Sequence, residues 1–182
     1  MTISEALDLS ILHFTTCLLH LPVHIPIELR QIIHFYFVIP IDNITIREAI
    51  GELSLSRYGQ NNHIHRYRPS TTNYYYSIFL LKYGPIEYWD TSKVTDMSEL
   101  FASLVCKEFN DNINHWNVGN VTDMSQMFCN AYVFNQRLDS WDVRNVTTFS
   151  SMFHGASNFN QPLNNWSISN VMDMDSMFCD AS

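Results

Sequence analysis

Three residues with metal-binding side chains recur at one position of the C-terminal half. Cys129, His154 and Cys179 follow one another at intervals of 25 residues. Thiolates and imidazoles are preferred ligands of Zn²⁺. Stacked segments about 4.8 Å apart would place the two cysteines about 10 Å from each other, beyond the reach of a disulfide. Three ligands in a line also suit tetrahedral zinc poorly. We therefore expect no metal site here, and the cysteine usage favours a reducing compartment.

The rest of the sequence has no arrangement typical of catalysis. It contains no Ser/His/Asp set, Gly-rich phosphate loop or zinc-hydrolase motif. The remaining histidines and cysteines are scattered along the chain. We expect a protein that is not an enzyme and that uses no cofactor.

A repeat determines where these residues lie. Four units begin at residues 86, 113, 138 and 163. Their tryptophans, which are 27, 25 and 25 residues apart, are Trp89, Trp116, Trp141 and Trp166. The same intervals separate Val94, Val121, Val146 and Val171, and also Phe101, Phe128, Phe153 and Phe178. Such a period indicates units that bury their apolar faces against their neighbours, as in a solenoid. Because solenoids mostly present binding surfaces, the repeat favours an interaction protein.

The pattern within one unit predicts a short strand followed by a short helix. Trp141 and Val143 alternate, which suits a strand near residues 140–144. Asp123 and Gln126 have the spacing of a capping box at the start of a helix. We therefore expect an α/β fold: a right-handed leucine-rich-repeat-like solenoid of ~25-residue strand–helix units. The stacked asparagines of this array, Asn110, Asn135 and Asn160, should bond the backbone of its turns.

The motifs of the repeat are specific enough to suggest a family. Residues 89–101 (WDTSKVTDMSELF) and 159–178 (FNQPLNNWSISNVMDMDSMF) resemble the BspA-type leucine-rich-repeat family, also known from mycoplasma lipoprotein-associated repeats. The resemblance covers residues 83–182, about four units. It implies a surface or interaction protein without a catalytic site. Two departures are an insertion of two residues between Phe101 and Phe109, and Phe149 where the other units have Met.

Charge narrows the choice of partner. Residues 1–82 carry six basic and six acidic residues, whereas residues 83–182 carry four and twelve, so the net charge of −8 lies on the repeats. An acidic array repels phosphate backbones, which argues against nucleic acid. We expect protein partners, held by exposed positions beside the strands. The candidates for this contact are Lys93, Asn120, Arg144 and Asn170.

The N-terminal half, residues 1–82, is expected to be helical and to cap the first unit. Residues 22–39 predict a helix that starts after Pro26. A second amphipathic helix is marked by Ile46, Ala49, Ile50 and Leu53. Residues 22–45 also resemble an F-box, a motif that docks onto the Skp1 adaptor of ubiquitin ligases. This resemblance implies that Pro26, Leu29 and Ile33 contact the adaptor, and it makes a ubiquitin-ligase substrate adaptor an alternative function.

The sequence also bears on location. Residues 9–23 are largely apolar, but Glu5 and Asp8 precede them and no Lys or Arg does, which is the wrong charge for a signal peptide. The stretch is too short and too rich in His to span a bilayer. We expect a cytoplasmic protein with no membrane span. A secreted or surface adhesin is the alternative, and it requires residues 9–23 to act as a signal.

Overall fold

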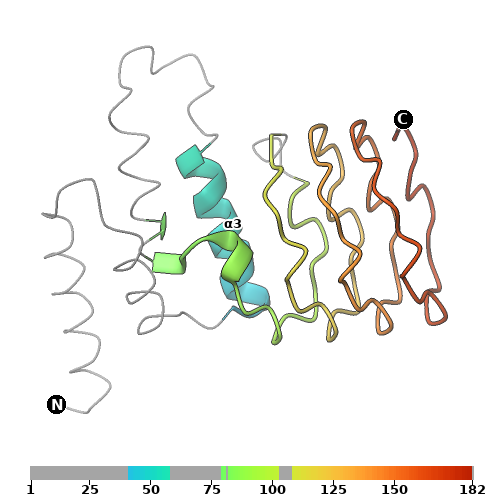
Figure 1. The fold of residues 1–182 in the computed structure, drawn as a ribbon, viewed down its shortest axis with the longest axis horizontal. Coiled ribbons are helices and arrows are strands. Elements are labelled where there is room, and N and C mark those ends of the chain that lie inside the picture. The colour runs from blue at the N-terminus through green and yellow to red at the C-terminus, as the bar shows by residue number, and fades with distance from the viewer. Residues whose placement is uncertain (1–40, 58–78, 81, 103–107, 182) are drawn as a thin grey trace, which may run out of the picture. The chain divides into compact units, whose positions relative to one another are not determined.

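A computed structural model describes residues 41–57, 79–80, 82–102 and 108–181 (Figure 1). The chain divides into two compact bodies, residues 1–36 and 37–182, and all described residues lie in the second. Its α-helix α3 spans Asn43–Arg57, and a 3-10 helix, η1, spans Ile86–Tyr88. None of the helices within the described ranges is long and apolar enough to cross a membrane.

Helix α3 is the amphipathic helix expected from its apolar spacing. Asp42 precedes it, and the Asp42 carboxylate accepts hydrogen bonds from the backbone N–H groups of Ile44 (3.0 Å) and Thr45 (2.9 Å). These bonds, led by the one from Thr45, lower the pKa of Asp42. The side chains that α3 buries are Ile46, Ala49, Ile50 and Leu53. This part of the prediction is confirmed.

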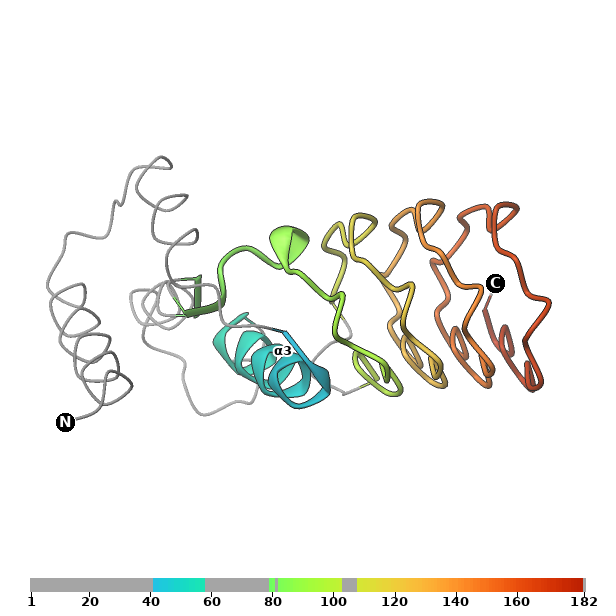
Figure 2. The ribbon, with the colours of Figure 1, turned by 90° about the horizontal axis from the view of Figure 1, so that it is seen from below.

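The expected fold class is wrong. After η1, the described part of the repeats runs through turns and irregular segments, without α-helices or strands of more than a single bridge. The parallel bridges are Asp96–Asp123, Asp123–Thr148 and Thr148–Asp173. The units are therefore not the strand–helix units of a leucine-rich-repeat solenoid. Apart from the short green ribbon of η1 at the start of the first unit, Figure 2 shows the units as tubes without coiled ribbons or arrows.

Backbone geometry explains why neither the expected helix nor the expected strand forms in a unit. Where a helix was expected, Gln126 has a φ of 56°, which interrupts a right-handed helix. The same position is left-handed in the other units, at Glu99, Ser151 and Ser176. Where a strand was expected, the Trp141 N–H bonds the Leu138 carbonyl (3.2 Å) and closes a tight turn. Each unit is thus a series of turns.

The units are joined by a backbone ladder in which alternate N–H groups donate to the following unit. The N–H groups of Met124, Gln126 and Phe128 donate to carbonyls of the next unit at 3.2, 2.8 and 2.9 Å. Their acceptors are Thr148, Ser150 and Met152. The intervening N–H of Met127 instead bonds the Met124 carbonyl of its own unit (3.3 Å). The ladder satisfies the backbone of each unit only when a neighbour is present.

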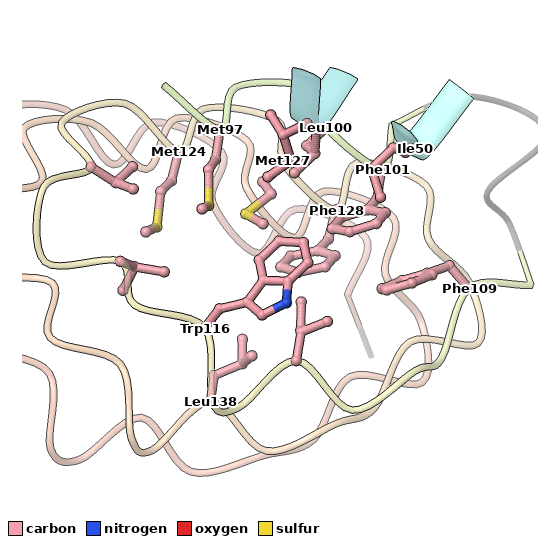
Figure 3. Close-up of a cluster of buried hydrophobic side chains, with 14 of the residues drawn as sticks. Ile50, Met97, Leu100, Phe101, Phe109, Trp116, Met124, Met127, Phe128 and Leu138 are labelled. Atoms are coloured by element: carbon pink, nitrogen blue, oxygen red, sulfur yellow. The ribbon is translucent and has the colours of Figure 1, made fainter. Parts of the chain in front are cut away.

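Aromatic columns run through the core along the same direction. Rings of the column Phe101, Phe128, Phe153 and Phe178 lie 5.4, 5.5 and 5.5 Å apart and are nearly parallel. A second column of Phe109, Phe134 and Phe159 has centroid separations of 5.9 Å. Figure 3 shows the Phe101 and Phe128 rings stacked, with Phe109 and Trp116 beside them. Each inner ring is therefore buried by rings from neighbouring units.

The asparagine column bonds the backbone, as expected. The Asn135 N–H donates to Asn110 Oδ1 (2.9 Å), and the Asn160 N–H donates to Asn135 Oδ1 (2.9 Å). Gln161 Nε2 also donates to Asn135 Oδ1 (2.9 Å). One amide oxygen thus satisfies two donors of the next unit, which fixes the turn between units.

This contact predicts a measurable loss of stability. Asn135→Ala removes the acceptor of both Asn160 N–H and Gln161 Nε2, so the free energy of unfolding should fall by about 1–2 kcal/mol. Urea unfolding followed by tryptophan fluorescence measures this change. Asn160→Ala is the matched control, because Asn160 Oδ1 accepts no hydrogen bond from any described residue. Equal losses in both variants would contradict the structural role of the column.

Candidate functional site

The predicted contact residues Lys93, Asn120, Arg144 and Asn170 are all exposed. Two of them also join units: Asn120 Nδ2 donates to the Ser92 carbonyl (2.8 Å) and Asn170 Nδ2 to the Arg144 carbonyl (2.7 Å). An amide held in this way is part of the framework of the repeat. Whether these residues contact a partner stays a prediction.

Arg144 lies one residue before the position that Lys93, Asn120 and Asn170 share in their own units. Asn145 occupies the asparagine position, since its Nδ2 donates to the Gly119 carbonyl (2.6 Å). Alignment on Val146 was the sequence signal for this register. The Arg144 guanidinium instead hydrogen-bonds the Asp142 carboxylate, which lowers the pKa of Asp142 to about 2. The pair is exposed on both sides, so it adds little to stability.

The sequence also predicted functional residues in the N-terminal half. Pro26, Leu29 and Ile33, the expected adaptor contacts, lie outside the described residues. So does the stretch 9–23, on which a secreted location depends.

The fourth unit exposes side chains of a kind that the inner units bury. We call this surface the end face: Ile168, Met172, Met174 and Phe178 are 48, 87, 42 and 47% exposed. The equivalent residues of Ile168, Met174 and Phe178 in the third unit are Val143, Phe149 and Phe153, which are 1, 0 and 0% exposed. The end face is therefore a cross-section of the core that faces away from the third unit.

Four backbone donors lie on the same face. In the third unit the N–H groups of Phe149, Ser151, Phe153 and Gly155 donate to the fourth unit at 2.8–2.9 Å. Their counterparts in the fourth unit are the N–H groups of Met174, Ser176, Phe178 and Asp180. Among the residues that the structure describes, these four have no hydrogen-bond acceptor. The end face thus combines apolar side chains with a row of free donors, which we call the N–H row.

Carboxylates border this surface. Asp173, Asp175 and Asp180 are all exposed. The Asp173 side chain accepts the Asp175 N–H (2.9 Å), and the Ser176 hydroxyl lies 3.2 Å from Asp175 Oδ2. A partner with Lys or Arg around an apolar centre would complement this arrangement.

At the first unit, α3 supplies the contacts that a neighbouring unit makes elsewhere. Arg47 Nη1 donates to the Ser98 carbonyl (2.7 Å). The equivalent Ser125 carbonyl accepts the N–H of Glu99 in the preceding unit (2.9 Å). An arginine therefore takes the place of a missing backbone donor.

Asp96 reinforces this contact. Arg47 Nη2 lies 2.9 Å from Asp96 Oδ1, and the Asp96 carboxylate also accepts the Ser98 N–H. Partial burial acts to raise the pKa of Asp96, but the Ser98 hydrogen bonds and the Arg47 charge outweigh it, so the pKa is lowered. The first unit thus shows that a non-repeat element can satisfy a free backbone row.

Sequence reasoning missed the end face, although one signal was visible. Met172 occupies the position of Thr122 and Thr147 in the preceding units. A single apolar residue on a surface is ordinary, so this substitution becomes informative only together with the exposed Ile168, Met174 and Phe178 beside it.

Comparison with known proteins gives one match. Residues 70–182 match the family described as "Mycoplasma protein of unknown function, DUF285". No curated protein matches the chain, and no solved structure does. The match covers most of the chain, including all four units.

Proposed function

We propose a protein-interaction function for this chain, which belongs to the DUF285 family, with the end face as its binding surface. The observation that carries the proposal is the exposure of Phe178, 47%, against 0% for Phe153 at the same position of the third unit. Apolar side chains gathered on one surface favour its burial, and the backbone donors beside them require acceptors once water is excluded. No catalytic chemistry is needed for this role.

The N–H row defines what the partner must offer. At each junction between units, such a row is covered by carbonyl groups of the next unit, and a phenylalanine ring stacks about 5.5 Å away. We infer that the end face is covered by a polypeptide segment that carries a unit of this type with its carbonyl groups free. Basic residues on that partner would pair with Asp173, Asp175 and Asp180.

A second copy of the chain suits the end face less well. Two end faces placed against each other would bring donor rows together, and donors do not hydrogen-bond donors. The carbonyl row of the first unit is already contacted by Arg47 at Ser98. A segment with an open carbonyl row, from beyond the described residues or from a different protein, meets neither obstacle.

A labelled peptide tests the proposal directly. The probe is a fluorescent peptide of residues 113–162, two units whose first row of carbonyls has no preceding unit. It is titrated with the full chain, and binding is followed by fluorescence anisotropy. The double variant Met172→Gln/Phe178→Gln should weaken binding by about 30-fold, because it removes about 2 kcal/mol of apolar burial.

The control variant removes apolar surface elsewhere. Ile44 and Leu55 on α3 are 71 and 70% exposed, so Ile44→Gln/Leu55→Gln changes a similar amount of surface away from the end face. This control should bind like the wild type. Equal weakening by both variants, absence of peptide binding, or self-association of the chain that Phe178→Gln removes would each overturn the proposal.

An F-box-like adaptor function remains a separate prediction. It depends on Pro26, Leu29 and Ile33 and is independent of the end face. Recovery of an Skp1-type adaptor that is lost on their triple replacement by alanine would support it.

A further inference from the structure

A second site, with different chemistry, lies between the third and fourth units. A ring nitrogen of His154, the thiol sulfur of Cys179 and a carboxylate oxygen of Asp180 all lie within 4.8 Å of one another. Within this cluster, Cys179 Sγ is 3.8 Å from Asp180 Oδ2. The three groups offer one nitrogen, one sulfur and one oxygen ligand.

The backbone ladder holds these residues in register. The Phe153 N–H donates to the Met177 carbonyl (2.9 Å), and the Gly155 N–H donates to the Cys179 carbonyl (2.8 Å). These bonds flank His154 and fix it beside the fourth unit. Asp180, which follows Cys179, has a φ of 57°, so its side chain leaves the chain in a different direction from a continued helix or strand. The cluster is therefore built by the stacking of two units.

His154 carries an unexplained polar atom. Its Nδ1 is buried and has no hydrogen-bond partner among the described residues. Buried side-chain nitrogens in proteins nearly always have a partner. Coordination of a cation through Nδ1 would give this atom a partner that the described residues do not supply.

We propose that His154, Cys179 and Asp180 bind Zn²⁺. Imidazole, thiolate and carboxylate are its usual ligands, and a tetrahedral site brings ligand atoms to about 3.5 Å from one another. Small movements of the exposed Cys179 and Asp180 side chains would bring the ligand atoms from within 4.8 Å of one another to that spacing. Water would occupy the fourth position. The linear set Cys129–His154–Cys179 is unsuited to this geometry, but Asp180 takes the place of Cys129 and makes the set compact.

Cobalt provides the spectroscopic test. The full chain, kept reduced and metal-free, is titrated with Co²⁺, and the thiolate-to-cobalt charge-transfer band in the near ultraviolet is recorded. We expect a band that saturates at one equivalent and disappears when Zn²⁺ displaces Co²⁺. Cys179→Ser and His154→Gln should weaken binding by more than the roughly 10–100-fold that loss of an outer-shell partner causes. Asp180→Asn should weaken it as well.

Cys129→Ser is the matched control. Cys129 occupies the same position two units earlier, where its sulfur accepts a contact from Asn130 Nδ2 (3.4 Å) and lies outside the cluster. This variant should keep the band and the affinity. Circular dichroism of the aromatic side chains in metal-free samples verifies that each variant is folded. Absence of the band in the wild type, its persistence in folded Cys179→Ser, or its equal loss in Cys129→Ser would overturn the proposal.

Discussion

Replacement of Phe128 by alanine is expected to lower the free energy of unfolding by about 3–5 kcal/mol. The Phe128 side chain is fully buried. Its ring lies 5.4 Å from that of Phe101, 5.5 Å from that of Phe153 and 4.0 Å from that of Phe134. Because these rings come from three units, the cavity left by alanine would open at two junctions. Urea unfolding followed by tryptophan fluorescence gives the free-energy change.

The same column contains its own control. Phe178 is 47% exposed and stacks on Phe153 at 5.5 Å, with no ring of a following unit among the described residues. Phe178→Ala should therefore cost less than half as much as Phe128→Ala. Similar losses would mean that stacking between units contributes little to the burial of the column.

Replacement of Gly155 by alanine is expected to lower the free energy of unfolding by about 2–4 kcal/mol. Gly155 has a φ of 67°, and a Cβ atom added there would lie 2.6 Å from Asn130 Oδ1. The left-handed backbone alone does not require glycine, since Asn130 and Asp180 occupy this position in neighbouring units with φ of 59° and 57°. Asn and Asp adopt this conformation more readily than Ala, and the Asn130 amide oxygen must also turn aside, so its displacement adds to the strain of the left-handed backbone. Chemical unfolding of the variant measures the total loss.

A double-mutant cycle separates the two contributions. In an Asn130→Gly background the clash is absent, so Gly155→Ala should cost only about 1–2 kcal/mol, the strain of the left-handed backbone. Gly119→Ala is the control, because its added Cβ would meet Asn117 Oδ1 at an ordinary 3.4 Å. That change should alter stability by less than about 0.5 kcal/mol. Identical costs of Gly155→Ala in both backgrounds would contradict the role of Asn130.

The sequence predicted which side chains of the repeat are buried, but it did not predict the conformation of the backbone. Spacing alone identified Phe128, Phe153 and Val146 as inward-facing, and all three are fully buried. The residues read as helix caps also suit turns, because Asp and Ser side chains satisfy free N–H groups in both. Nothing at Glu99 or Gln126 announces a positive φ, since neither is Gly or Asn. The turn series therefore replaced the expected helix without a visible signal.

The candidate site was harder to predict because exposure depends on the neighbours of a unit. Phe153 and Phe178 occupy the same position, and among the described residues only Phe153 is covered by a ring of a following unit. The proposed zinc cluster was hidden for a related reason. His154 and Cys179 share one position of the repeat, 25 residues apart. Asp180 belongs to the next position, so the repeat pattern alone does not associate it with them.

Most N–H groups of the ladder donate toward the following unit, although those of Thr122, Thr147 and Met172 donate toward the preceding one, and this imbalance has an electrical consequence. In segments 97–101, 124–130 and 149–155, the N–H groups that bond between units all point toward the following unit. Peptide dipoles aligned in this way add, as they do in a helix, leaving partial negative charge at the first unit and partial positive charge at the fourth. At the fourth unit, Asp173, Asp175 and Asp180 have the sign opposite to this partial charge, whereas at the first unit the cation of Arg47 is paired with Asp96. The acidic border of the end face thus neutralises a field that its own backbone creates.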